Sequence, residues 1–529
     1  MKGKPRSRLF APGLCPLVLL GSLLTAPAAP ADVVVGPGGH VPGTSRNFVQ
    51  VGHAPLANRG MNAALAVFGR YVYVGNRTDG SARCGAGDPR IPVSGPDSCP
   101  HAAPGIQVVD TLNPFRPRVV GEFGAELATG ANLGQTSREM RVLPDQRLLA
   151  VMYFRCSTVI HACPPSPDVW SIRFFDLAAD PVNPPLLATY VPSRKPHEMF
   201  LWTDPRRTGR SLLFLSTPTS SADPAVANLV VTDVSRAREG VFPEIARGNW
   251  NNLYPGAEVP ANYDNDLALH SMAVTVDGNR TYLAYLRGHF LVLDTSDVAA
   301  GRIPPGGLSL NDKLLTPVEN RPRWGTADGG CLDECAESHS AVPVPGRPFA
   351  FTVDEVYGTF TAPSFGCPWG WTRTIAVSDP ARPRIVGEYR TVPNTREFCG
   401  SPGDDPATEQ FTSYSSHNPT LTRNLVIMAW HSSGLQAIDI ADPARPTQAG
   451  WFSPAPLATV ATEDPALSRG PNKVVMWSYP IIHNGLIYVV DVRNGLYILA
   501  YTGRRALEVA RIRFLEGNST LGDAARLDR

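Results

Sequence analysis

The chain has 529 residues, of which 43% are hydrophobic and 18% are charged, and its formal net charge at pH 7 is +1. This length and apolar content allow a large core and exclude a disordered or collagen-like chain. The balanced charge gives no electrostatic basis for binding nucleic acid or an anionic membrane surface. Abundant proline (52) and glycine (47) indicate many turns between short strands.

Residues 1–31 have the pattern of a secretory signal peptide. Basic residues between positions 2 and 8 precede an apolar core at 16–24, and small residues at 29–31 offer a cleavage site. The apolar run is too short, and too interrupted by proline, for a membrane anchor. No later segment is apolar enough to span a bilayer. We therefore expect an exported monomer, either secreted or kept in the periplasm or at the cell surface.

Cleavage of this peptide removes Cys15 from a total of nine cysteines and leaves an even number, which favours disulfides in an oxidising compartment. Cys84 with Cys99 and Cys156 with Cys163 lie within single loops and are the predicted pairs. A second group has a pairing that the sequence leaves open: Cys331, Cys335, Cys367 and Cys399. A zinc site is the alternative for this group, because its first two members are four residues apart.

The rest of the chain repeats one unit every 50 to 70 residues, roughly, as in repeat proteins. The clearest copy, residues 415–452, has strands from His417, at 425–430, at 435–440, and after a proline-rich turn at 442–446. The two prolines of that turn have no backbone donor, so the turn must lie outside the strand ladder. Units at 105–123 and 374–389 close with nearly the same residues.

Seven such units between residues 47 and 515 predict an all-β fold, a seven-bladed β-propeller with four-stranded blades. A closed ring leaves no blade with an unpaired face. The strand at 47–52 is predicted to complete the last blade, with 507–513 as the competing candidate. Residues 32–46 are assigned to a flexible segment and 516–529 to a C-terminal tail. A stacked solenoid or a row of β-sandwiches is the alternative architecture.

The repeated text resembles the LVIVD-repeat family of exported bacterial β-propellers, whose units follow the pattern GLxIVDxSDPxxPxxVG. The match covers most of the chain after the signal peptide and is most specific at 105–121, 374–387 and 434–450. It is weaker in the second and third units, where insertions intervene. The resemblance implies the propeller fold and implies no particular activity.

Alignment of the units places the first residues of the inner strands opposite one another: Asn62, Arg138, His197, His270, His339, His417 and Ser478. Histidine occupies four successive positions, although the chain has only 11 histidines. Inner strands line the axis of a propeller, so these imidazoles are expected to meet at one mouth of the channel. His483 aligns with a turn and is excluded.

Converging imidazoles are a usual way to hold Fe, Cu or Zn, so His197, His270, His339 and His417 are the predicted metal ligands. Glu139 and Glu198 are predicted to orient the rings. The alternative is that the four histidines descend from a duplicated unit and hydrogen-bond across the channel without a metal.

Four further residues lie at or beside the end of the second strand of a unit. His431 either reaches the same mouth or is an exposed loop residue. Of Asp354, Glu355 and Asp491, at least two are expected to do no more than anchor loops.

The longest loops and all cysteines after the signal peptide are predicted on the face where the histidines start their strands. Loops that disulfides hold together over the histidine-lined mouth of a channel are typical of a site for a small molecule or a protein partner. The sequence has no P-loop, no zinc-protease motif and no serine-hydrolase elbow, so no nucleotide cofactor is expected.

The predicted function is a metal-dependent oxidoreductase. Residues 430–450 resemble, over one unit, the selenium-binding proteins (methanethiol oxidases), which place histidines near a propeller axis, as carotenoid-cleaving oxygenases do with iron. The alternative is a binding or cell-surface scaffold without enzymatic activity, for a protein or glycan partner.

Overall fold

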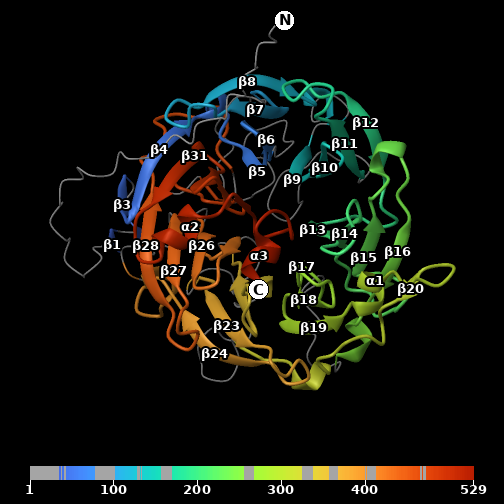
Figure 1. Cartoon of the computed structure of the whole chain (residues 1–529). Helices are drawn as coiled ribbons and strands as arrows, with labels where there is room; N and C mark the ends of the chain where they lie inside the picture. Colours follow the sequence, from blue (N-terminus) through green and yellow to red (C-terminus); the bar gives the residue numbers. More distant parts are fainter. Residues whose placement is uncertain are drawn as a thin grey trace, which may run out of the picture. The chain divides into compact units, whose positions relative to one another are not determined.

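Seven antiparallel β-sheets follow one another along the chain and stand around a common axis (Figure 1). The predicted seven-bladed β-propeller is therefore confirmed. The computed structural model describes residues 35–36, 39–40, 43–77, 102–127, 132, 134–155, 169–254, 267–324, 338–356, 367, 369–399, 401, 413–464, 467–468 and 472–529. The predicted signal peptide lies outside these residues, as do six of the cysteines: Cys84, Cys99, Cys156, Cys163, Cys331 and Cys335.

Each blade is numbered in chain order and begins with its inner strand. Blades one to three contain β5 (Asn62–Phe68), β6 (Tyr71–Asn76), β7 (Ile106–Asp110), β8 (Arg118–Phe123), β9 (Gln135–Leu143), β10 (Leu148–Arg155), β11 (Trp170–Asp176), β12 (Leu186–Tyr190), β13 (Glu198–Thr203), β14 (Ser211–Ser216), β15 (Leu229–Asp233) and β16 (Glu244–Gly248). Blades four to seven contain β17 (Ser271–Val274), β18 (Arg280–Ala284), β19 (Phe290–Asp294), β21 (Ser338–Pro343), β22 (Phe349–Asp354), β23 (Thr372–Ala376), β24 (Arg384–Tyr389), β25 (Pro419–Leu421), β26 (Leu425–Ala429), β27 (Leu435–Asp439), β28 (Thr447–Ser453), β29 (Ile481–His483), β30 (Leu486–Asp491) and β31 (Gly495–Tyr501).

Short helices connect some of these strands: α1 (Ser296–Ala300), α2 (Ala506–Ala510), α3 (Ala524–Leu527), and the 3₁₀ turns η1 (Leu56–Asn58), η2 (Ala125–Leu127), η4 (Ala237–Glu239), η5 (Asn251–Leu253), η7 (Val318–Asn320) and η8 (Val392–Asn394). In the described part of the chain, none of the helices has the length and apolar character needed to cross a membrane. A two-residue hairpin, β1 (Val35–Gly36) with β2 (Gly39–His40), precedes the propeller.

Blade four has three regular strands, and an irregular segment takes the place of its outer strand. Leu314 forms a bridge to Leu293 of β19, and the amide of Leu315 donates to the carbonyl of Val292 at 2.8 Å. The same connection first forms β20 (Leu308–Ser309), which adds a fifth strand to blade three beside β16. Proline and charged residues interrupt the apolar pattern around both β16 and β20.

Packing between blades explains the repeated Asp-Pro and Val-Gly residues. Asp442 caps its proline turn by accepting the amide of Ala444 at 3.1 Å. The glycine of the preceding outer strand, Gly387, lies against this turn, and a Cβ there would come 2.3 Å from the carbonyl oxygen of Pro443. Gly52 meets Pro114 in the same way, at 2.0 Å. Glycine is therefore required at both of these contacts between a blade and the proline turn of the next one.

The ring is closed by β4 (Phe48–Ala54), which pairs antiparallel with β31 and forms the outer strand of blade seven. This confirms the predicted closure by the N-terminal strand. The competing segment instead forms α2 and then β32 (Phe514–Leu515), which pairs with the inner strand β29. Residues that were assigned to the flexible segment form β3 (Thr44–Arg46), which pairs with the edge of β28.

The C-terminal residues 516–529 lie inside the ring, and α3 is at its centre (Figure 1). Asn518 accepts the amide of Leu201 at 3.1 Å, and Thr520 donates its amide to the carbonyl of Leu201 at 3.0 Å. On the opposite side, the amide of Gly346 donates to Asp528 at 3.1 Å. The assigned tail is therefore a folded plug between inner strands of several blades.

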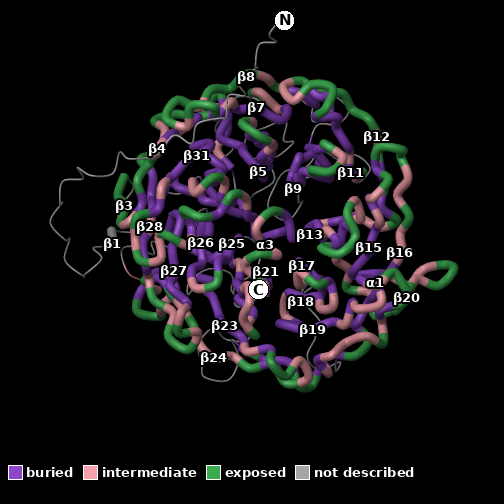
Figure 2. Tube along the Cα trace, viewed as in Figure 1, coloured by how far each residue is buried: buried purple, intermediate pink, exposed green. Residues whose placement is uncertain are grey.

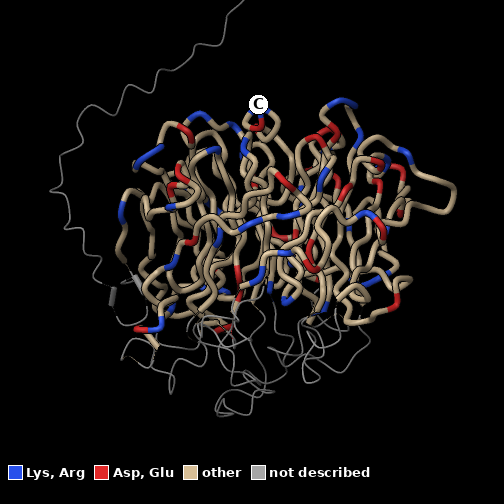
Figure 3. The backbone as a smooth tube through the Cα atoms, turned by 90° about the horizontal axis from the view of Figure 1, so that it is seen from below, with Lys and Arg blue, Asp and Glu red and all other residues tan. Residues whose placement is uncertain are grey.

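Apolar side chains fill the spaces between neighbouring blades, with Trp202, Trp250, Tyr285 and Trp430 among the fully buried ones. Buried residues follow the strands, while exposed residues lie on turns and outer edges (Figure 2). Figure 3 shows basic and acidic residues interspersed around the ring. The rigid inner strands therefore hold whatever polar side chains they carry in fixed positions near the axis.

Candidate metal centre

Four histidines stand at the start of four successive inner strands. His197 and His270 immediately precede β13 and β17, His339 is the second residue of β21, and His417 comes two residues before β25. Neighbouring ring centres are 4.5 Å apart for His197 and His270, 3.9 Å for His270 and His339, and 4.6 Å for His339 and His417. The structure therefore brings all four predicted ligands into one row.

His431 and Glu355 extend this row from the ends of second strands. His431 follows β26, and its ring centre is 4.8 Å from that of His417. Glu355 follows β22. Its Oε1 lies 3.2 Å from Nε2 of His417 and 3.2 Å from Nε2 of His431, while its Oε2 lies 3.1 Å from Nε2 of His339. The carboxylate of Glu355 thus contacts three imidazoles.

The other ring nitrogen of each of these imidazoles has its own partner. Nδ1 of His417 is 2.6 Å from the carbonyl oxygen of Trp477, and Nδ1 of His270 is 3.0 Å from that of His339. Nδ1 of His339 and of His431 lies 2.9 Å from the hydroxyl oxygens of Ser340 and Ser413. Such outer partners fix the orientation of a ring and direct its Nε2 inward.

The Nε2 atoms of His339 and His417 and Oε1 of Glu355 are buried, and none of them has a well-aligned hydrogen bond. A buried polar atom without such a bond costs free energy, so these atoms are candidate ligands for a metal ion. The rings are also packed against aromatic groups, since the indole of Trp477 stacks on His431 at 5.3 Å and lies 4.1 Å from His417. The cluster is therefore buried and bordered by aromatic rings.

Burial sets the charge of these groups. It lowers the pKa of His417 to about 3 and lowers the pKa of His431. It also lowers the pKa of His197 and His270 well below the ordinary value. Burial alone would raise the pKa of Glu355, but its contacts with His339 and His417 hold this pKa well below the usual range. Burial therefore favours neutral rings for these four histidines, and neutral imidazole is the form that binds metal ions.

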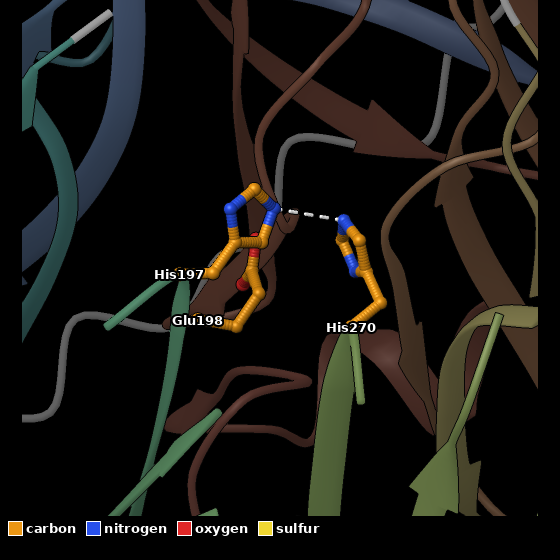
Figure 4. Close-up of side chains that lie close together, drawn as sticks. All are labelled: His197, Glu198 and His270. Atoms are coloured by element: carbon orange, nitrogen blue, oxygen red, sulfur yellow. Dashed lines mark hydrogen bonds between the residues drawn. The ribbon is translucent and has the colours of Figure 1, made fainter. Parts of the chain in front are cut away.

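The other end of the row contains His197, His270 and Glu198 (Figure 4). Nε2 of His197 lies 2.9 Å from Nε2 of His270. Burial, reinforced by the charge of Glu139, raises the pKa of Glu198 well above its ordinary value. Potential ligand atoms of these three residues lie within 4.8 Å of one another.

Glu139, predicted to orient a histidine ring, is used elsewhere. Its Oε2 accepts a hydrogen bond from Nη2 of Arg141 at 2.7 Å, and both side chains are buried. Glu198, by contrast, belongs to the histidine row as a potential ligand. His483, which was excluded, packs against Tyr488 and Phe514 at the far end of β29.

The sequence did not single out Glu355 among three acidic residues at strand ends. The other two anchor loops, as expected for at least two of the three. Asp354 accepts from Nε1 of Trp324 at 3.1 Å and pairs with Arg373, and Asp491 accepts the amides of Val475 and Arg493. Alignment of second-strand ends, as was done for the inner strands, could have placed Glu355 beside His431.

Beyond the imidazoles, the site is bordered by arginines and aromatic rings. The guanidinium of Arg138 lies 5.5 Å from the ring centres of both Phe154 and Trp477. It forms no hydrogen bond or ion pair with another described residue, although the residue is 8% exposed. Arg77, also over Trp477 at 4.0 Å, is paired with Asp464 at 2.8 Å. Arg138 is therefore a cation held by cation–π contacts beside the row.

Two members of the second cysteine group, Cys367 and Cys399, lie among the described residues. Cys367 and Cys399 form a disulfide with a Cα–Cα distance of 5.4 Å. The sequence had left this pairing open, and the bond excludes both residues from a zinc site. The other cysteine predictions concern positions outside the described residues.

The fold and this cluster define the protein as a β-propeller with buried histidine and glutamate groups that could hold a metal ion. No protein-family model matches the chain, and no curated protein matches it. The conclusion about the site therefore depends on the geometry.

Solved structures with a similar fold include the β-propeller domain of Cps50 (Swd1) from Myceliophteria thermophila, with a TM-score of 0.40, 10% identity, and coverage of 86% of this chain and 98% of that one. Sqt1 from Saccharomyces cerevisiae gives a TM-score of 0.43 at 8% identity, covering 87% of this chain and 100% of that one. The computationally designed Ika8 protein gives 0.36 at 9% identity, covering 85% and 98%. At these values the similarities say nothing about function.

Proposed function

We propose that this protein binds a transition-metal ion through Glu355, His417 and His431 and acts as an exported metal-dependent oxidoreductase. One contact carries the proposal. Nδ1 of His417 faces the carbonyl oxygen of Trp477, which can only accept, so Nδ1 carries the ring proton. In the neutral ring, Nε2 is then a lone pair directed at an ionised carboxylate oxygen 3.2 Å away.

Two facing lone pairs repel each other, so a proton or a metal ion is expected between the two atoms. Burial lowers the pKa of His417 to about 3, which disfavours the protonated ring near pH 7. A metal ion satisfies both atoms at once. The distances of 3.2 Å from Oε1 of Glu355 to Nε2 of His417 and to Nε2 of His431 also resemble the edges, about 3.3 Å long, of a tetrahedron of ligands at 2.0–2.1 Å from zinc.

The donor set suits iron, copper or zinc, because imidazole and carboxylate are ligands that these ions share. A bound ion of this kind would supply Lewis acidity or, for iron and copper, electron transfer. The chain's own residues would orient the substrate: Trp477 offers a flat apolar surface, and Arg138 beside it offers an unpaired positive charge. We therefore propose a small substrate that carries a negative charge.

The N-terminal pattern supports export, and the repeat text supports a relationship to the LVIVD-repeat propellers. Metal analysis of the purified protein tests the proposal, with Glu355→Gln as the diagnostic variant and Glu319→Gln, at an exposed position, as its control. We expect metal in the wild type and the control and none in Glu355→Gln. Dioxygen consumption in the presence of thiols or aromatic alkenes then tests the oxidoreductase activity. Metal-free wild-type protein would overturn the proposal and favour a binding scaffold.

A further inference from the structure

The row of ligand atoms is longer than one metal ion can use. Three sets of residues have ligand atoms within 4.8 Å of one another: His197 with Glu198 and His270, His270 with His339 and Glu355, and Glu355 with His417 and His431. Ligands at 2.0–2.2 Å from one ion lie at most about 4.4 Å apart. One ion can therefore serve one end of the row, and the other end keeps its donors.

Glu355 divides the row between its two oxygens. Oε1 faces Nε2 of His417 and of His431, whereas Oε2 faces Nε2 of His339 on the other side. The ring of His339 lies 3.9 Å from that of His270, centre to centre. A carboxylate whose oxygens face different sets of nitrogen donors has the arrangement of a bridge between two ions.

The position of the ring proton of His270, on the second side, is fixed in the same way as that of His417 on the first. Nδ1 of His270 faces the carbonyl oxygen of His339 at 3.0 Å, so it carries the proton and Nε2 is a lone pair. That lone pair is directed toward Nε2 of His197 at 2.9 Å (Figure 4). The buried carboxylate of Glu198, in the same set, forms no hydrogen bond or ion pair with another described residue.

We infer that the centre holds two first-row transition-metal ions bridged by Glu355. The first is the ion of the proposed function, held by His417, His431 and Oε1 of Glu355. The second is held by His270, His339 and Oε2 of Glu355, with His197 as a further ligand. Two-metal sites in enzymes hold their ions about 3.5–4 Å apart, a span that a bridging carboxylate fits. This inference rests on the proposed function, because the two ions share Glu355.

The competing arrangement has a single ion and an ordinary hydrogen bond at the other end. In that case His197 is protonated on Nε2 and donates to the lone pair of His270. The two arrangements differ in the number of ions per chain, and only the first makes the two ends of the row magnetically coupled.

Copper(II) is a suitable probe, because its amount and its magnetic coupling can both be measured. The full exported chain is saturated with Cu(II), freed of excess copper, and analysed by elemental analysis and by electron paramagnetic resonance. We expect two ions per chain and an integrated resonance signal well below the copper content. In His270→Ala we expect one ion and recovery of an uncoupled signal equal to the copper content. His483→Ala, which changes a histidine at the far end of β29, should keep two coupled ions.

The wild-type count alone decides between the outcomes, even where a variant fails to fold. One ion in the wild type overturns the second site and leaves the proposed function standing. No ion overturns both. Two ions with an uncoupled signal, or two ions retained in folded His270→Ala, would place the second ion elsewhere and also overturn the inference. Circular dichroism establishes that each variant used is folded.

Discussion

Two buried polar clusters lie inside the same ring, and they differ in how their charges are satisfied. In the Arg141 cluster, Nη2 of Arg141 donates to Glu139 at 2.7 Å and to the carbonyl of Met199 at 2.6 Å, and Nε donates to the carbonyl of Asn518 at 3.2 Å. In the Glu355 cluster, Oε1 of the carboxylate faces Nε2 of His417 at 3.2 Å, and neither of these two buried atoms has an aligned hydrogen bond.

The difference separates a structural role from a ligand-binding one. A buried charge whose partners are all provided by the chain needs nothing further, and here it ties the C-terminal plug to the inner strands. A buried group left without a partner costs free energy, and such costs are typical of functional sites. The following predictions test this contrast, from the largest expected effect to the smallest.

The largest effect is expected at Glu355. Glu355→Gln removes the charge that neutralises the metal, so we expect the bound metal to be lost on dialysis. The metal-free protein should be at least as stable as the metal-free wild type, because an unsatisfied buried charge has been removed. Elemental analysis and urea denaturation after treatment with a chelator measure the two effects. A large loss of stability with metal retained would show that Glu355 is structural.

Arg141→Met should have the opposite effect. It leaves the carboxylate of Glu139 buried without its partner, which typically costs about 3–5 kcal/mol of unfolding free energy. Metal content should not change, since Arg141 contacts none of the histidines through the hydrogen bonds described. Urea denaturation of the single variant and of the double variant with Glu139→Gln measures the cost. The double variant should recover part of it, and a loss of metal would contradict the separation of the clusters.

The metal-free protein should lose stability as the pH falls from about 6.5 toward 3. Burial lowers the pKa of His417 to about 3 and also lowers that of His431. Below pH 6.5 the unfolded chain therefore binds more protons than the folded one, and stability decreases with decreasing pH. Each such histidine changes the free energy of unfolding by at most about 1.4 kcal/mol per pH unit. Urea denaturation at pH 7.5 and 5.5 measures the slope, which should be smaller in His417→Gln. Equal stability at both pH values would contradict buried neutral rings.

Ser413→Ala should have the smallest effect on metal binding, although it also removes hydrogen bonds to the carbonyl of Val356 and from the amide of Ser415. The hydroxyl of Ser413 lies 2.9 Å from Nδ1 of His431, and loss of such an outer partner weakens metal binding by about 10- to 100-fold. Competition with a chelator of known affinity measures the change. Thr420→Val, which removes a buried hydroxyl bonded to the carbonyl of Pro480, is the matched control and should leave affinity unchanged. Equal losses in both variants would indicate general loosening of blade six.

The candidate site could be predicted in part because four of its members occupy the same position in repeated units. His197, His270, His339 and His417 fall at matched strand starts, so the alignment of the strands was sufficient to bring them together. Glu355 is not one of these matched strand starts. It follows Asp354, whose carboxylate pairs with Arg373, and it resembles Asp491, which anchors a loop. Only the direction of each side chain distinguishes the three.

The fold was more predictable than the site for a physical reason. Strands within a blade pair with their sequence neighbours, so alternating apolar runs and the proline turns determine seven blades locally. The glycines at outer strands follow from the same local rule, as Gly387 against Pro443 shows. The position of residues 516–529 does not, because they carry no strand pattern and pack against inner strands remote in sequence.

The sequence by itself thus determined the number of blades and the four histidines at the axis, since both follow from a repeated local pattern, and it favoured the correct closing strand over one competitor. The tertiary structure alone decided that Glu355 and His431 join them, that Glu139 is taken by Arg141, and that the C-terminal plug fills the ring. Apart from the pair of Glu139 and Arg141, which both lie on β9, these contacts join residues from different blades. They depend on where ring closure places each side chain.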